Sequence, residues 1–326
     1  MSSVSAIFYS GSSPIRSSIS RPYYGPTSTA SSSIWPWSPL PGASDGLGAP
    51  GTRSRRRGVL KERLLTALLA GALLLAGLWF LNTAGVGVLL GAVTLLAAFE
   101  WSGLAARRPV ARFAFPALVA FLGLASLLLP LAAVMAMAIL WWVWAAGEVF
   151  VFRDRASPVW RHAPVKCLSG VLILVPAWRG CLALKAQDPS RPMLLIWLLA
   201  MVWTADSAAY FAGRAFGRHR LAPFVSPGKT VEGAMAGIAG AAIVGGIGAS
   251  WLALSGLPAG RGALLGAAVA VASIVGDLLE SKAKRLAAVK DSGRLLPGHG
   301  GILDRIDALT AAVPLFVWTM RYLGVR

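Results

Sequence analysis

The sequence predicts an all-α integral membrane protein, a polytopic bundle of about nine transmembrane helices. Of its 326 residues, 56% are hydrophobic and only 13% are charged, whereas about 25% of the residues in soluble domains are charged. The apolar residues also form long blocks, and several blocks exceed the roughly 18 residues that indicate a membrane span. Basic residues gather between alternate blocks, as expected for a chain that crosses a membrane repeatedly.

The first 58 residues differ in composition from the rest. They are rich in Ser, Pro and Gly, contain Asp45 as their only acid, and carry a basic run at 53–57. We expect 1–58 to be a disordered or non-native extension and 59–326 to be the transmembrane domain. Three interpretations of the extension stay open: a disordered tail, an organellar transit peptide, or a misassigned start ahead of Val59.

Nine apolar blocks follow the extension, and each is near the roughly 20 residues needed to cross about 30 Å of hydrocarbon. In order they span 64–81, 84–99, 113–129, 131–152, 166–184, 193–212, 232–255, 262–280 and 308–323.

The charge distribution predicts an orientation. Lys and Arg number 31 against 13 acids, for a net charge of +18. The basic residues cluster before the first block and after the second, fourth, sixth and eighth blocks. The positive-inside rule then puts the N-terminus and the segments 213–231 and 281–307 on the inner face, with the C-terminus outside. Because these charges lie between membrane blocks, nucleic acid is not expected as a partner.

The segment 276–307 concentrates charge in a chain that otherwise avoids it. On a helix, Asp277, Glu280 and Lys284 share one face, and Asp304 and Asp307 share a face at the start of the last helix. Carboxylates beside basic residues favour a divalent metal with a polyphosphate, since Mg²⁺ binds a few carboxylates and leaves its other positions to water and phosphate. The alternative is that the basic residues are positive-inside signals and the acids are their surface partners. This is the favoured interpretation of Lys282 or Arg294 alone, but topology requires neither the glycines nor carboxylates at the ends of apolar blocks.

The segment 204–233 holds a second group of polar residues. Asp206 lies within an apolar block, which marks it as a functional candidate. A P-loop is excluded because Pro223 stands where its first glycine would be. Ser226, Lys229 and Thr230 are expected at the start of a helix, where they would form an anion site. Glu100 and Glu148 lie near span ends. A functional role is one interpretation of these two acids, but the favoured one is that they are interfacial or helix-paired carboxylates.

The C-terminal third resembles the signature of the phosphatidate cytidylyltransferases, and the resemblance covers about 59–326. The segments AYFAGRAFG, SPGKTVEG and LKERLLTALL are similar to this family too, while Ala283 departs from its usual larger apolar residue. The matching signature positions are Ser281, Lys284, Arg285, Lys290, Asp291, Gly293, Pro297, His299, Gly300, Gly301, Asp304, Arg305 and Asp307.

The resemblance implies an enzyme, a Mg²⁺-dependent nucleotidyltransferase. It would convert CTP and phosphatidic acid to CDP-diacylglycerol and pyrophosphate among membrane lipids. Asp277 and Asp304 are the expected metal ligands, with Asp307 and Asp291 next. Whether a monovalent cation joins Mg²⁺ and whether the protein is a homodimer stay open.

The other site residues take their expected roles from the same resemblance. Lys284, Arg285 and Lys290 would hold the triphosphate, and His299 would donate a hydrogen bond. Lys229 and Ser226 would approach the lipid phosphate or the nucleotide. Arg305 completes the catalytic set, and the substrate-binding set also contains Asp206, Thr230, Ser281, Gly300 and Gly301.

The expected location is the bacterial inner membrane, with the active site on the cytoplasmic face. Resemblance to proteobacterial members favours a misassigned start; a transit peptide would instead indicate a plastid membrane. A CTP-dependent lipid alcohol kinase and a cation-coupled transporter are the alternatives. The full signature argues against the kinase, and the lack of inverted repeats in the sequence argues against the transporter.

Overall fold

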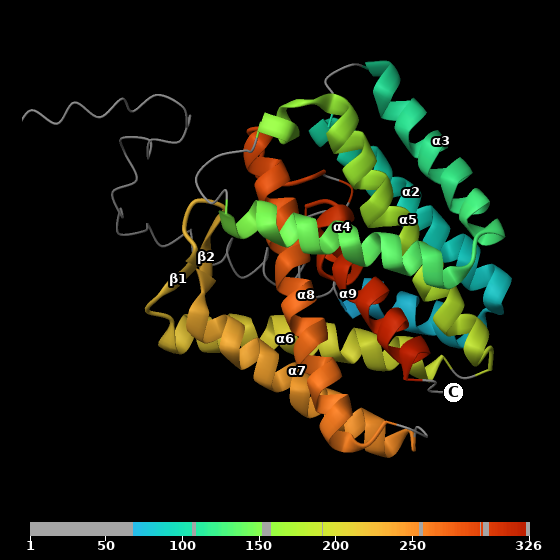
Figure 1. Cartoon of the computed structure of the whole chain (residues 1–326), viewed down its shortest axis with the longest axis vertical. Helices are drawn as coiled ribbons and strands as arrows, with labels where there is room; N and C mark the ends of the chain where they lie inside the picture. The colour runs from blue at the N-terminus through green and yellow to red at the C-terminus, as the bar shows by residue number, and fades with distance from the viewer. Residues whose placement is uncertain are drawn as a thin grey trace, which may run out of the picture. The chain divides into compact units, whose positions relative to one another are not determined.

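The computed structural model describes residues 68–105, 109–151, 158–190, 192–253, 257–293, 295 and 300–323. The predicted extension 1–58 and the domain boundary that follows it lie outside these residues. Every predicted apolar block overlaps a helix, which confirms the helical class (Figure 1). The helices are Leu68–Phe80, α2 (Thr83–Ala105), α3 (Pro109–Ala125), α4 (Leu131–Val151), α5 (Ala163–Gln187), α6 (Met193–Phe216), α7 (Val231–Trp251), α8 (Ala259–Leu286) and α9 (Leu303–Tyr322).

Within the described residues, 6 helices are long and apolar enough to cross a membrane: α2, α4, α5, α6, α7 and α8. Leu68–Phe80 is a shorter apolar helix, and α9 begins with charged residues. Large apolar side chains such as Val88, Leu140 and Trp251 are exposed on the outside of these helices. Such surfaces suit a lipid environment, where the helix satisfies its own backbone polar groups.

Small residues bring α6, α7 and α8 into close contact. A side chain at Gly237 of α7 would collide with the backbone of Ala205 in α6, and Gly245 of α7 meets Gly262 of α8. Without a hydrophobic force between helices in lipid, such close backbone approach is a main source of helix association. Figure 1 shows α8 crossing α6 and α7.

The helices alternate in direction, so their charged ends meet at one end of the bundle, here called the polar end. Glu100 near the end of α2 accepts hydrogen bonds from the first residues of α9, and Lys282 near the end of α8 donates to the Glu148 carbonyl of α4. Lys229, just before α7, pairs with Asp277 of α8. The segment 213–231 and the described residues of 281–307 therefore lie at the same end, as predicted.

A short β-hairpin replaces the predicted helix start around Ser226. Strand β1 (Arg220–Ala222) pairs antiparallel with β2 (Ser226–Thr230), and Arg220 lies opposite Thr230. Helix α7 begins only at Val231, because the Thr230 hydroxyl accepts the Gly233 N–H as an N-cap at 3.1 Å. The prediction that Ser226 and Lys229 begin a helix was wrong: both lie on β2.

Candidate active site

A cavity of about 620 Å³ opens at the polar end between α6, α7, α8 and the hairpin. Small residues of the helices form much of its wall, which leaves space between their backbones. Its charged lining consists of three basic and two acidic residues: Arg214, Arg220, Lys229, Asp206 and Asp277. The space is large enough for a substantial polar group, and the basic residues favour an anionic one.

Lys229 and Asp277 form an ion pair across the cavity, with Nζ and Oδ2 2.5 Å apart and both side chains about one-third exposed. Asp206 of α6 lies within electrostatic range of both. Ser281, one turn along α8, donates its hydroxyl to Asp277 Oδ1 at 3.3 Å. The structure therefore brings together four predicted site residues from two segments of the sequence.

A second charged cluster lies further along α8. Lys284 Nζ donates to Glu280 Oε2 at 2.9 Å and to Asp304 Oδ1 at 2.7 Å, which joins α8 to α9. Glu280 is buried, and Lys284 and Asp304 are only slightly exposed. The predicted shared face of Asp277, Glu280 and Lys284 is confirmed, with Glu280 as an additional member of the site.

Asp307 lies between the two clusters. It is within electrostatic range of Asp277 and Lys229, and its side chain also interacts with Glu280. A side chain at Gly276 would collide with the Asp307 carbonyl, so glycine lets α8 and α9 approach closely at this point. The close approach brings Asp307 of α9 near Asp277 and Glu280 of α8.

The start of α9 is held by Asp304 itself. Its carboxylate accepts the N–H groups of Gly301 at 2.8 Å and of Ser292 at 3.2 Å. Gly300 has a φ of +85°, a conformation that favours glycine. Gly300 and Gly301 thus shape the loop around Asp304, and Asp291 lies beside Gly300.

Other predicted residues take different positions. Arg285 donates its Nε to the Val225 carbonyl at 3.2 Å and so ties the hairpin to α8. Lys290 and Arg305 are exposed at the polar end. Within the described chain, the cavity lining includes Lys229 and Thr230 but not Ser226. His299 and Pro297 lie outside the described residues.

Glu100 is the site neighbour that sequence reasoning missed. It is 5% exposed and binds the loop before α9 rather than the membrane interface or a neighbouring helix side chain. Lys282 was interpreted as a surface topology signal, but it is buried with Glu148 and its Nζ lies 3.8 Å from Glu148 Oε2. An acid near the end of an apolar block was the available signal for both glutamates.

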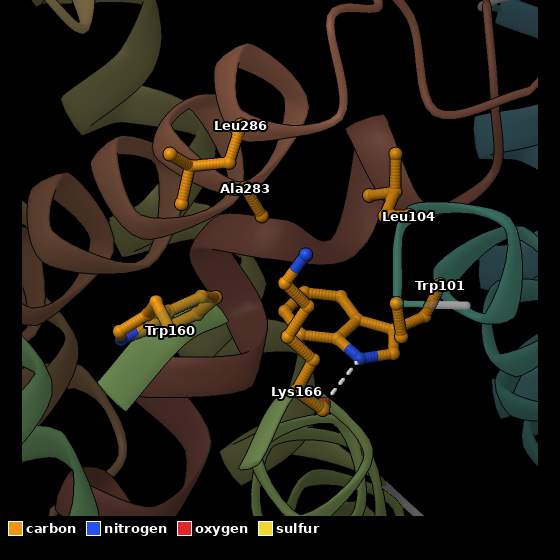
Figure 2. Close-up of a pocket in the computed structure, with 7 residues that line it drawn as sticks. Trp101, Leu104, Trp160, Lys166, Ala283 and Leu286 are labelled. Carbon is orange, nitrogen blue, oxygen red and sulfur yellow. Dashed lines mark hydrogen bonds between the residues drawn. The ribbon is translucent and has the colours of Figure 1, made fainter. Parts of the chain in front are cut away.

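Packing beside the site is tight. Figure 2 shows Trp101, Trp160 and Lys166 around a pocket that leaves no room for a water molecule. The Trp101 indole N–H donates to the Lys166 carbonyl at 2.8 Å. This region joins α2, α5 and α8 and supports the polar end rather than binding a ligand.

The acidic residues provide a partial test of the predicted Mg²⁺ site. Among the described residues, no group of three or more His, Cys, Asp or Glu side chains is arranged as a ready metal site. Asp277 nevertheless faces Asp206 and Asp307 within electrostatic range, with Lys229 as their shared basic partner. These carboxylates are the groups that could share a cation with a bound phosphate, since Mg²⁺ binds a few carboxylates and leaves its other positions to water and phosphate.

A bundle of membrane-length helices with a charged cavity at one end defines a polytopic membrane protein with a site suited to anions. Residues 61–323 match the Cytidylyltransferase family, and the chain belongs to this family.

Bacterial relatives cover most of the chain. It is 43% identical to the phosphatidate cytidylyltransferase of Pseudomonas aeruginosa, over 79% of this chain and 96% of that protein. It is 36% identical to the protein of the same name from Haemophilus influenzae, over 79% of this chain and 97% of that protein. The phosphatidate cytidylyltransferase of Brucella suis is 37% identical, over 78% of this chain and 91% of that protein.

Proposed function

We propose that the protein transfers the cytidylyl group of CTP to phosphatidic acid, giving CDP-diacylglycerol and pyrophosphate. The observation that carries this proposal is the charged cavity between α6, α7 and α8, in a member of the Cytidylyltransferase family whose helix α8 also carries the Lys284–Asp304 cluster. The relatives' names support the same substrates.

The reaction needs positioning and charge neutralisation more than proton transfer. A phosphate oxygen of phosphatidic acid attacks the α-phosphorus of CTP, the new P–O bond forms, and the bond to the bridging oxygen of pyrophosphate breaks. The attacking oxygen is already ionised at neutral pH, so the reaction requires no general base. The barrier comes largely from repulsion between two anions, which fixed cations reduce.

The two clusters divide the work in this proposal. Lys229, with Arg214 and Arg220 in the same cavity, would bind the lipid phosphate. Lys284 would hold the triphosphate and stabilise the departing pyrophosphate, with Lys290 nearby in the sequence. Arg285 contributes by fixing the hairpin, since its Nε is bonded to Val225.

Mg²⁺ would be held by Asp277 and Asp304, and it would supply charge neutralisation between the phosphates. Asp277 is the more open of the two, since its side chain is 32% exposed and that of Asp304 is 11% exposed. Triphosphate binding to Lys284 would free one Asp304 oxygen. Asp206 and Asp307 would add negative charge around Asp277.

The proposed setting is a bacterial inner membrane with the polar end at the cytoplasmic face. CTP is available there, and the basic residues of the connecting segments favour that orientation. The cavity lies among membrane-length helices, so the lipid headgroup reaches it while the acyl chains stay in the hydrocarbon.

The test uses membranes containing the protein, phosphatidic acid, Mg²⁺ and CTP labelled at the α- or the γ-phosphate. Label from α-labelled CTP should enter the lipid fraction, and γ-label should leave as pyrophosphate. Transfer of the γ-label to lipid would instead establish a CTP-dependent lipid kinase. Absence of transfer from either position, with correctly inserted protein, would overturn the proposal.

A further inference from the structure

We infer that Glu100 of α2 is a positioning residue that closes the neck of the loop between α8 and α9 and so holds Asp304 against Lys284. This inference rests on the proposed cytidylyl transfer and adds to it a residue from a distant part of the sequence. Glu100 acts through the loop and does not need to touch a substrate.

The Glu100 carboxylate binds both sides of the loop neck. Its oxygens accept the N–H of Ile302 at 3.1 Å, the N–H of Leu303 at 2.8 Å and the Ser292 hydroxyl at 3.0 Å. Ser292 precedes the loop and Ile302 follows it, so one buried carboxylate joins the two. Hydrogen bonds to a charged acceptor are stronger than neutral ones.

Asp304 binds the same neck from the other side. It accepts the backbone N–H of Ser292, while Glu100 accepts that residue's hydroxyl. It also accepts the N–H of Gly301, next to the Ile302 N–H that Glu100 binds. The two carboxylates therefore bind the same two ends of the loop, and loss of Glu100 would remove its three hydrogen bonds to Ser292, Ile302 and Leu303.

Helix α9 depends on this external partner at its start. Its N-cap residue, Ile302, has no side chain that can accept a hydrogen bond, so the first N–H groups need another acceptor. Glu100 provides it for Ile302 and Leu303, and a negative charge at a helix N-terminus is electrostatically favourable. Asp304 lies in the first turn that this contact fixes.

The loop has glycine at both places where it passes Glu100. A side chain at Gly293 or at Gly301 would collide with the Glu100 carboxylate. The loop can therefore approach the Glu100 carboxylate this closely only because both positions lack a side chain.

Glu100 is also held on its own helix. The next residue, Trp101, is 2% exposed and is bonded to the Lys166 carbonyl of α5 (Figure 2). The carboxylate thus projects from a fixed helix end, and the loop takes its position from α2 rather than the reverse.

The experiment compares Glu100→Ala and Glu100→Gln with Ser102→Ala in purified protein. Ser102 is a matched control because it is buried on the same end of α2 and donates to Phe99 of its own helix. Turnover and KM for each substrate would be measured per folded protein. Hydrogen–deuterium exchange would be followed in peptides that contain residues 300–306.

Glu100→Ala should lower kcat on the order of 100-fold, because catalytic groups displaced by about 1 Å lose this much. KM for phosphatidic acid should stay within about twofold, since the lipid-phosphate cavity lies around Lys229. Glu100→Gln should be intermediate, as its amide keeps one acceptor oxygen. Exchange should speed up in both variants at 300–306 and stay unchanged in α6, while Ser102→Ala should match the wild type.

The inference would be overturned by a Glu100→Ala protein with wild-type kcat, by activity lost only in proportion to unfolded protein, or by unchanged exchange at 300–306. Failure of the proposed function appears differently, as a wild-type protein that transfers no cytidylyl group. In that case the exchange measurement still tests whether Glu100 holds the loop in place.

Discussion

At the scale of single residues, two lysines each form an ion pair that joins two elements of the fold. Lys229 joins β2 to Asp277 of α8, and Lys284 joins α8 to Asp304 of α9. In the proposed reaction, a metal–triphosphate complex would offer phosphate oxygens to the lysines and a cation to the carboxylates. The ion pairs thus keep the charges in place in a low-dielectric region until the substrates arrive.

We predict that Lys229→Met lowers turnover about 10- to 100-fold, because the lipid phosphate loses a fixed cation and Asp277 loses its partner. The loss should appear in kcat/KM for phosphatidic acid measured in mixed micelles. Arg321→Gln is the control, since it removes the same charge from the last turn of α9. Equal activity of the two variants would contradict a role for Lys229 in the site.

Asp277→Asn and Asp304→Asn should each abolish measurable turnover while the protein still inserts into the membrane. Each change keeps the side-chain volume but removes a negative charge from the proposed Mg²⁺ site. Asp188→Asn, in the connection after α5, is the control. Activity should be measured over a Mg²⁺ titration, and near-normal activity of both site variants would refute the metal assignment.

These residues show which parts of the site could be predicted from the sequence. Asp277, Lys284 and Asp304 stood out because charges are rare in an apolar chain. Their spacing also puts Asp277 and Lys284 on one helix face, and Asp304 and Asp307 on one face of the last helix. Glu100 could not be assigned in this way, because its partner Ile302 is 202 positions away. Lys282 was misinterpreted because a buried lysine and a topology signal look the same in a sequence.

At the scale of elements, hydropathy predicted the helices well, but it could not reveal the hairpin. Strands β1 and β2 have 3 and 5 residues, too few for a strand pattern to emerge next to Pro223 and Pro227. The hairpin is held instead by specific contacts, such as Arg285 with Val225 and His219 with Glu232. The hairpin positions Lys229 next to Asp277.

Helix contacts made by glycine give a prediction of their own. Gly262→Ala should lower stability by about 1–3 kcal/mol, because its methyl group would collide with Ala249 and with the Gly245 carbonyl of α7. Gly260→Ala, two positions earlier on α8, meets no atom within 4 Å and should cause no loss. Thermal unfolding in detergent would compare them, and equal stability would contradict close α7–α8 packing.

At the scale of the whole molecule, the alternation of helix direction matters most for function. Contacts between Glu100 and Leu303 and between Lys282 and Glu148 bring segments from three parts of the sequence to one end. The regular spacing of basic residues predicted this meeting, because successive membrane crossings leave every second connection on the same side. Hydropathy and charge thus predicted which segments meet, but not which side chains touch.

The orientation of the polar end can be tested with single cysteines. After Cys167 and Cys181 are replaced by alanine, Val289→Cys would mark the polar end, since Val289 is exposed just after α8. Ser190→Cys would mark the opposite end, in the connection between α5 and α6. In intact bacteria a membrane-impermeant maleimide should label position 190 and not 289, and in inverted vesicles it should label 289 and not 190. This outcome follows from retention of basic segments on the cytoplasmic side. The opposite pattern would separate the site from cytoplasmic CTP, and would contradict the proposed reaction even if the bundle itself were correct.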